Sequence, residues 1–199
     1  MRIGIFGGTF DPVHLGHLIA AEQSREQAHL HEVRFVPAAR PPHKSNRPLT
    51  PFGNRAEMLE LAIAGHPAFR IDRLEKERPG PSYTVDTLEE LLRSQAGAEL
   101  TLIVGSDCLP DIATWREPAR IGEIADLLVV TRPGADVRSG EISQFLPAGL
   151  RVRQIITKPV IDISSHDLRR RLAEGKSVRY LVPRAVESYI EAHGLYRAG

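Results

Sequence analysis

The chain has few of the features that mark disulfide-rich, membrane or nucleic-acid-binding proteins. Its 199 residues include a single cysteine, Cys108, which excludes an internal disulfide framework and is typical of a reducing cytoplasm. No hydrophobic run is long enough for a membrane span, and the apolar start is too short for a signal peptide. The formal net charge of +1 argues against nucleic acid or a membrane surface as a partner. Any bound anion must therefore be held by local charges and donors.

The residues that are present are typical of a globular protein. Hydrophobic residues make up 42% of the chain and charged residues 26%, proportions that allow a buried core under a polar surface. We find no internal repeat, low-complexity tract or linker, and 199 residues fit one ordinary domain. We therefore expect a single domain over residues 1–199. No pattern in the sequence indicates an oligomeric state.

Short β-rich runs alternate with amphipathic stretches along the chain. The expected strands are residues 3–6, 33–36, 69–71, 100–104, 127–131 and 152–156. The expected helices include residues 15–28, 54–64 and 83–93, and a last helix with Pro183 in its first turn. Strands that alternate with helices predict an α/β fold, in which helices cover both faces of a parallel sheet.

Polar and glycine-rich segments follow three of the expected strands. In an open parallel sheet, ligands bind beyond the carboxyl ends of the strands, where the loops enter the helices. Residues 7–17, 105–107 and 132–134 occupy such positions. We expect these three loops to meet on one edge of the sheet.

Residues 7–17, GGTFDPVHLGH, have the composition of a phosphate-binding loop. Glycine permits positive φ and close approach of a ligand, so that Gly7, Gly8 and Thr9 can present several N–H donors together. A helix that starts near His14 would point its positive end at the same place. The alternative is a tight strand-to-helix turn in which the glycines only avoid steric clashes and bind no ligand.

The histidines favour the phosphate interpretation. His14 and His17 are three residues apart, which places both on one helical face within reach of a common anion, and Gly16 between them leaves room for it. A metal site is not expected, because no third ligand follows at a recognisable spacing. The dinucleotide fingerprint G-x-G-x-x-G is also absent from this segment.

Two separated motifs resemble those of a known superfamily. Residues 8–17, GTFDPVHLGH, resemble the H-x-G-H signature of the nucleotidyltransferases, and residues 163–169, ISSHDLR, resemble their I-S-S-x-x-[IV]-R motif. Further segments resemble the bacterial nicotinate-nucleotide adenylyltransferase family, namely PAARPPHK (37–44), SYTVDTL (82–88), GSDCLPDIATWREP (105–118), TRPG (131–134) and LVPRAVESYI (181–190). The resemblance runs from Ile3 to Ile190. It implies a Rossmann-like, doubly wound parallel sheet with a helical C-terminal part.

The resemblance also implies an activity, the transfer of the adenylyl group of ATP to nicotinate mononucleotide with release of pyrophosphate. The attacking phosphate has its second pKa at about 6, so it is already an anion at neutral pH and needs no general base. The enzyme has to align the reactants and stabilise the transition state, in a direct in-line attack without a covalent intermediate. Mg²⁺ would accompany ATP. Consistent with this, the sequence has no G-x-S-x-G nucleophile motif.

The family motifs assign site residues by position. The two histidines, His14 and His17, would be catalytic and would each present a donor near the α-phosphate, a state that nearby phosphates favour by raising histidine pKa values. The ATP-binding residues implied are Gly7, Gly8, Thr9, Phe10, His14, His17, Asp107, Ser164, Ser165 and Arg169. The acceptor-binding residues implied are Lys44, Thr84, Trp115 and Arg132.

Several of these residues also have a simpler interpretation. Lys44 is then a solvated lysine, Asp107 caps a short helix, and Trp115, the only tryptophan, is a core residue. Thr84 either reads the nicotinate carboxylate, with the amides of residues 113–115, or caps the 83–93 helix. The sequence does not decide between these two roles.

One motif departs from the family pattern, because His166 stands where relatives usually have threonine. Ser164 and Asp167 there also fit a capping box, which would use some of the helix donors internally. Arg170 and Arg171 are expected to form a solvated helix face. The rival functions are a sister enzyme acting on phosphopantetheine, glycerol phosphate or nicotinamide mononucleotide, a nucleotide-binding module without catalysis, and a nucleic-acid binder.

Overall fold

The computed structural model describes residues 1–42, 48–131, 146–147, 149–156, 159 and 161–197. Its centre is a six-stranded sheet in the order β3-β2-β1-β4-β5-β6, in which every neighbouring pair is parallel. The strands are β1 (Arg2–Gly8), β2 (Glu32–Pro37), β3 (Phe69–Ile71), β4 (Glu99–Gly105), β5 (Ala125–Val130) and β6 (Val152–Ile156). All six strands were expected from the sequence, and the α/β prediction is confirmed.

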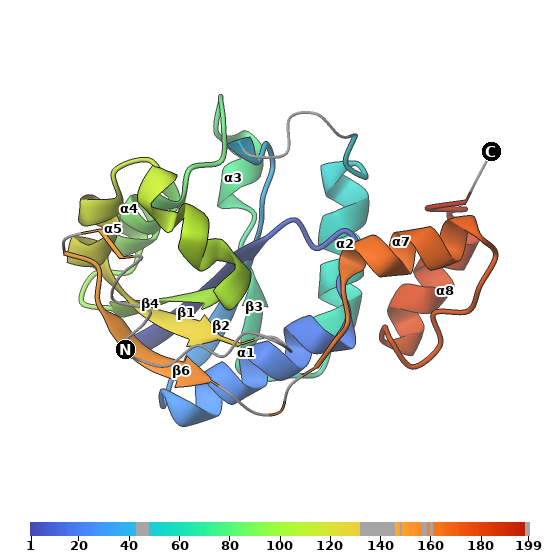
Figure 1. Cartoon of the computed structure of the whole chain (residues 1–199), viewed down its shortest axis with the longest axis horizontal. Helices are drawn as coiled ribbons and strands as arrows, with labels where there is room; N and C mark the ends of the chain where they lie inside the picture. The colour runs from blue at the N-terminus through green and yellow to red at the C-terminus, as the bar shows by residue number, and fades with distance from the viewer. Residues whose placement is uncertain (43–47, 132–145, 148, 157–158, 160, 198–199) are drawn as a thin grey trace.

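Helices cover both faces of the sheet (Figure 1). They are α1 (Leu15–Gln27), α2 (Phe52–Ile63), α3 (Leu74–Glu77), α4 (Thr84–Ser94), the 3-10 helix η2 (Ser106–Thr114), α5 (Pro118–Ile124), α7 (Ser165–Ala173) and α8 (Arg184–Ala192). Pro183 lies just before α8 as its N-cap, where the sequence placed it inside the first turn. That the whole chain is one domain stays a prediction.

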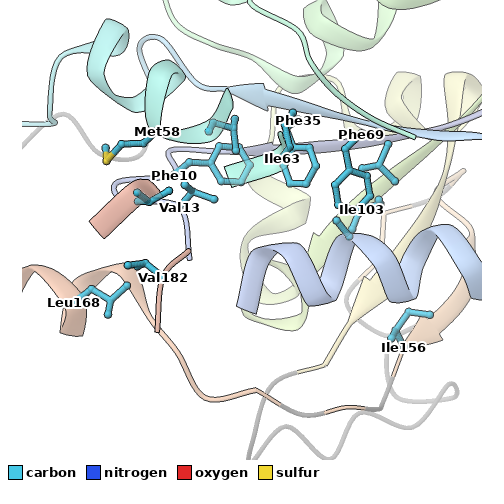
Figure 2. Packing of buried hydrophobic residues seen from close by; sticks show 14 of the residues in the cluster. Phe10, Val13, Phe35, Met58, Ile63, Phe69, Ile103, Ile156, Leu168 and Val182 are labelled. Carbon is cyan, nitrogen blue, oxygen red and sulfur yellow. The ribbon is translucent and has the colours of Figure 1, made fainter. Parts of the chain in front are cut away.

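Two hydrophobic clusters fill the space between these layers. One joins α1, α2 and the C-terminal helices to the sheet, and the other joins α4, η2 and α5 to its opposite face. Figure 2 shows the first cluster, in which Val13 of the loop after β1 lies between Phe10 and the C-terminal residues Leu168 and Val182. The loop after β1 is therefore packed against the C-terminal part of the chain.

The strand order reverses between β1 and β4, because the chain winds outward from β1 to β3 and then returns to β4 beside β1. Ligands of doubly wound sheets bind at such a switch point. The segments that leave β1 and β4 begin at Thr9 and Ser106. Residues 132–134, the third loop expected at this edge, lie outside the described residues. No helix in the described part of the chain is long and apolar enough to cross a membrane.

Candidate active site

Two cavities open at the carboxyl ends of β1 and β4. The histidine cavity, of about 510 Å³, is lined by His14, His17 and residues of the segment before and within α7. The tryptophan cavity, of about 620 Å³, is lined by Trp115 and the start of α4. Both cavities share Phe6, Gly7, Gly8, Thr9, Gly105, Asp107 and Cys108 in their linings. Ligands in the two cavities would therefore meet across the ends of these two strands.

His14 and His17 lie together in the histidine cavity, but not for the reason that their spacing suggested. His14 is the N-cap of α1 and has an extended backbone, with φ −145° and ψ 170°, so it is not part of the helix. The two rings instead stack on one another, with centroids 3.6 Å apart and planes 28° apart. The prediction that the pair lies together is confirmed, whereas the shared helical face is wrong.

A hydrogen bond shows which nitrogen of the neutral His17 ring carries the proton. The backbone N–H of His14 donates to Nδ1 of His17 at 3.2 Å. An accepting Nδ1 carries no hydrogen, so the ring proton of neutral His17 is on Nε2. His17 thus has an N–H donor without needing a positive charge.

The main-chain amides at the start of α1 are used inside the protein more than the sequence suggested. Leu15 donates to the carbonyl of Leu181 at 3.0 Å, and His17 donates to the carbonyl of His14 at 3.0 Å. Fewer helix donors than expected therefore remain for an anion.

The glycines at positions 7, 8 and 16 leave space for neighbouring groups, and none of them has a positive φ. Gly7 and Gly8 belong to β1, where they pair with Val36 and Pro37, and neither has a positive φ. A Cβ on Gly7 would meet nothing within 4 Å, which leaves its face open to a ligand. A Cβ on Gly16 would lie 3.0 Å from Nδ1 of His14. Gly16 therefore makes room for the His14 ring, and it also lines the histidine cavity, so that its role toward an anion stays a prediction.

The left-handed residue of this segment is Phe10, with φ 47°. Its side chain is 1% exposed and meets the rings of His17 and Phe6 edge-on, with centroids 5.1 Å and 5.7 Å apart. Phe10 lines the histidine cavity as part of the core. Phe10 therefore packs against the His17 ring and, because it is buried, offers a ligand little surface.

The segment that begins α7 binds the loop after β1. Ser165 Oγ donates to the carbonyl of Pro12 at 2.9 Å, and Arg169 Nη1 donates to the carbonyl of Asp11. Ser164 caps the helix, since its Oγ accepts from the Asp167 amide at 3.1 Å, which confirms that part of the capping pattern. All three predicted residues line the histidine cavity, and so does His166.

The two arginines that follow have different environments. Arg170 is exposed and pairs with Asp167 at 2.8 Å, which confirms the expected solvated face at that position. Arg171 is half-buried and donates to the carbonyl of Ser177 at 2.8 Å and 3.0 Å. The expectation is wrong for Arg171, which ties α7 to the turn that follows it.

A cluster of buried polar residues that contacts the loop after β1 was not predicted from the sequence. Asp11, 1% exposed, accepts from the hydroxyl of Tyr196 at 2.6 Å and from the Thr50 amide at 3.4 Å. Arg55, also 1% exposed, donates to the carbonyls of Thr9 at 2.7 Å and Thr50 at 2.8 Å. Burial lowers the pKa of Arg55, and the charge of Asp11 opposes that shift. The cluster joins the loop after β1 to α2 and to the C-terminal turn.

The tryptophan cavity has aromatic and polar walls. Trp115 is half-buried at the end of η2, and the guanidinium of Arg116 lies 4.9 Å from the centroid of the Tyr83 ring. Thr84 lines the cavity as the first residue of α4. The N-cap of α4 is Tyr83, and no side chain caps it, so the capping alternative for Thr84 is wrong. The Trp115 amide donates to the Ile112 carbonyl at 3.2 Å, which removes it as a ligand donor.

The remaining predicted residues lie at the boundary or beyond the described chain. Asp107 is exposed in the first turn of η2 and lines both cavities, as does Cys108. Lys44 and Arg132 lie outside the described residues. Glu75 and Ser82 line the tryptophan cavity and were not predicted.

Comparisons with known proteins agree with this architecture. The cytidylyltransferase-like family model matches residues 5–171. A probable nicotinate-nucleotide adenylyltransferase from a strain of Thermus thermophilus is 53% identical over 201 residues, covering 99% of this chain and 100% of its own. The Thermomicrobium roseum protein of that name is 50% identical and covers 98% and 92%.

A solved structure shares the fold at lower identity. The nicotinic acid mononucleotide adenylyltransferase of Plasmodium falciparum, complexed with NaAD, matches with a TM-score of 0.82 and 21% identity, covering 98% of this chain and 97% of its own. The matches at about half identity extend along nearly the full length of both proteins. The chain therefore belongs to the cytidylyltransferase-like family and, within it, to the nicotinate-nucleotide adenylyltransferases.

Proposed function

We propose that the chain transfers the adenylyl group of ATP to nicotinate mononucleotide, giving nicotinate adenine dinucleotide and pyrophosphate, a step in NAD biosynthesis. The observation that carries this proposal is the meeting of two cavities at Gly7–Thr9 and Gly105–Cys108. A transferase that joins two nucleotides needs two sites whose reacting ends meet. The names of the relatives and the NaAD complex of the Plasmodium protein support the same reaction.

ATP binds in the histidine cavity in this proposal. His17 donates from Nε2 to the α-phosphate, and His14, stacked on it, lies beside the same group. A phosphate oxygen of the acceptor attacks the α-phosphorus, an O–P bond forms, and the bond to the β-phosphate oxygen breaks as pyrophosphate leaves. The open face of Gly7 lets the reacting phosphates come close to the backbone. Ser164, Ser165 and Arg169 line the same cavity.

Nicotinate mononucleotide binds in the tryptophan cavity. The indole of Trp115 offers a flat electron-rich face to the positively charged pyridinium ring. Thr84 at the start of α4 is our candidate for a contact to the nicotinate carboxylate, because it lines the cavity and its side chain does not cap the helix. Lys44 and Arg132 stay predicted acceptor contacts.

Mg²⁺ accompanies ATP in this proposal. In the described part of the chain, no group of three or more His, Cys, Asp or Glu side chains forms a metal site. Mg²⁺ is usually held by one or two carboxylates together with substrate phosphates and waters, and Asp107 is the carboxylate in the described lining of the histidine cavity. The residues thus fit an ion held mainly by the triphosphate. When bound, it would offset the charge of the phosphates.

Pyrophosphate release tests the proposal directly. The purified chain is assayed with ATP and either nicotinate mononucleotide, nicotinamide mononucleotide or phosphopantetheine, and with CTP in place of ATP as a control. We expect the highest kcat/KM with ATP and nicotinate mononucleotide. Turnover with phosphopantetheine at an equal or higher rate would assign the chain to a sister activity. The cytoplasmic location expected from the single cysteine stays a prediction.

A further inference from the structure

A buried carboxylate lies in the wall of the tryptophan cavity. Glu75 of α3 is 6% exposed, and Glu187 of α8, at 7%, is the other buried glutamate among the described residues. Glu187 is paired with Arg184 at 2.7 Å and Arg179 at 3.1 Å. No ion pair joins Glu75 to a lysine or arginine within the described ranges. A buried charge without a direct counter-charge costs free energy unless hydrogen bonds compensate it.

Hydrogen bonds from two other segments compensate Glu75. The hydroxyl of Thr87 in α4 donates to Oε1 at 2.6 Å, and the amide of Ala39 donates to Oε2 at 3.3 Å. Arg78 donates to the Thr87 hydroxyl at 3.0 Å and so reaches the carboxylate through it. Glu75 therefore links α4 to the segment that follows β2.

Ser82, two residues before α4, strengthens the same link. Its Oγ accepts from the amides of Ala39 at 3.1 Å and Arg40 at 3.0 Å, and its own amide donates to the Arg40 carbonyl at 2.9 Å. Ala39 therefore divides one N–H between Glu75 and Ser82. Ala39 and Arg40 are thus bonded to the side chains of Glu75 in α3 and of Ser82 just before α4.

The fixed segment is part of the cavity wall. Ala38, Pro41 and Pro42 line the tryptophan cavity together with Ser82 and Thr84. The Ala38 amide also donates to the Gly8 carbonyl at 2.8 Å, so without Glu75 this segment would stay attached to the sheet but would be held less firmly against α4. A preformed cavity binds its ligand more tightly because less ordering accompanies binding.

We propose that Glu75 is a positioning residue for the acceptor nucleotide, which holds residues 38–42 against α4 and so keeps the tryptophan cavity closed around its ligand. This inference rests on the proposed function. It assigns Glu75 no contact with the reacting atoms. The histidine cavity contains neither Glu75 nor residues 38–42 in its lining, so ATP binding does not depend on the link.

The test is steady-state kinetics of Glu75→Gln with each substrate varied in turn. The neutral amide cannot accept at both ends, so either Thr87 or Ala39 loses its acceptor. We expect the KM for nicotinate mononucleotide to rise about tenfold, as for loss of a charge-assisted bond, while the KM for ATP stays within twofold. Equal changes in both KM values, or no change in either, would overturn the proposal.

Matched variants separate positioning from stability. Thr87→Val removes the hydroxyl at constant shape and should reproduce the effect, whereas Thr87→Ser keeps the hydroxyl and should restore the normal KM. If Glu75→Gln does not fold, this pair decides the question. Glu187→Gln removes the other buried carboxylate and should lower stability with both KM values unchanged. A wild-type chain without turnover would refute the proposed function, whereas active wild type with an unaltered Thr87→Val variant would refute only this inference.

Discussion

The histidine cavity and the tryptophan cavity lie side by side but are built in different ways. The histidine cavity joins the loop after β1 to α7, residues more than one hundred positions apart in sequence, such as Pro12 and Ser165. The described wall of the tryptophan cavity comes largely from residues 36–42 and from residues 75–116, which are near neighbours in the sheet and helices. Polar contacts between segments hold both sites, but Pro12 and Ser165 are 153 positions apart, whereas Ala39 and Ser82 beside the tryptophan cavity are 43 apart.

In the proposed function, this difference follows from what each site binds. Phosphates need converging donors, and these must be held in place by further polar contacts, as Arg169 and Ser165 hold the Asp11–Pro12 backbone. A nucleotide ring needs flat and apolar surface, which Trp115 at the end of η2 can provide. We therefore expect changes in the histidine cavity to lower kcat and changes in the tryptophan cavity to raise the acceptor KM.

The largest effect should come from His17→Ala. The change removes the Nε2–H donor, and loss of one such donor typically lowers kcat about a hundredfold or more. The acceptor KM should stay near the wild-type value, since His17 is not in the lining of the tryptophan cavity. Rapid-mix measurement of pyrophosphate release, with circular dichroism to verify folding, checks the result.

His31→Ala is the control for this variant. His31 is exposed and accepts from the amide of Arg2 at 3.0 Å, outside both cavities. Its loss should leave kcat and both KM values unchanged. A folded His17→Ala variant with normal kcat would remove the distinction between the two cavities that we draw.

A smaller effect is expected on the acceptor side. Trp115→Ala should raise the KM for nicotinate mononucleotide about fivefold, because an aromatic pair contributes about 0.5–1.5 kcal/mol beyond its buried area. The kcat and the KM for ATP should change little. Trp115→Phe, which keeps a ring, should recover most of the affinity. Tyr180→Ala removes an aromatic side chain that is 83% exposed and serves as the unaffected control. A rise in the ATP KM alone would reverse our assignment of the cavities.

The sequence predicted the sheet and the histidine pair well because both are local signals. Short apolar runs mark the strands, and residues 7–17 hold their functional side chains in one continuous segment. The contact of Gly16 with the His14 ring was not predicted, since it depends on a backbone conformation that spacing does not reveal. The role of Thr84 was left open for a similar reason, because the sequence does not show whether Thr84 is the N-cap of α4 or its first residue.

The polar residues that support the two cavities were not predicted. Asp11, Tyr196 and Glu75 act through partners 12 to 185 positions away, and no sequence period links such positions. Arg55 did leave a signal. It lies three and four residues before Met58 and Leu59, on the apolar face of α2, where a charged residue needs a buried partner.

Tyr196→Phe should have the smallest effect on catalysis. It should act on stability, through the buried cluster that contains Asp11. The variant loses the 2.6 Å hydrogen bond to Asp11, and leaving a buried carboxylate with one partner fewer lowers the free energy of unfolding by about 1–2 kcal/mol at pH 7. The acceptor KM should not change. Urea unfolding at a series of pH values measures the difference.

The pH dependence tests whether the Tyr196 hydroxyl is buried and bonded in the folded protein. Burial, followed by the hydrogen bond to Asp11, raises the pKa of Tyr196 above its ordinary value of about 10. Below pH 10 the phenol is protonated in both states, and its contribution is complete. As the pH rises above 10, the unfolded chain loses this proton while the folded chain keeps it, so the wild type loses about 1.4 kcal/mol per pH unit through this group. Phenylalanine has no such proton, so the gap between the two proteins should narrow between pH 9 and pH 11. A constant gap would mean that folding does not raise the pKa of Tyr196, and so that its hydroxyl is not buried beside Asp11.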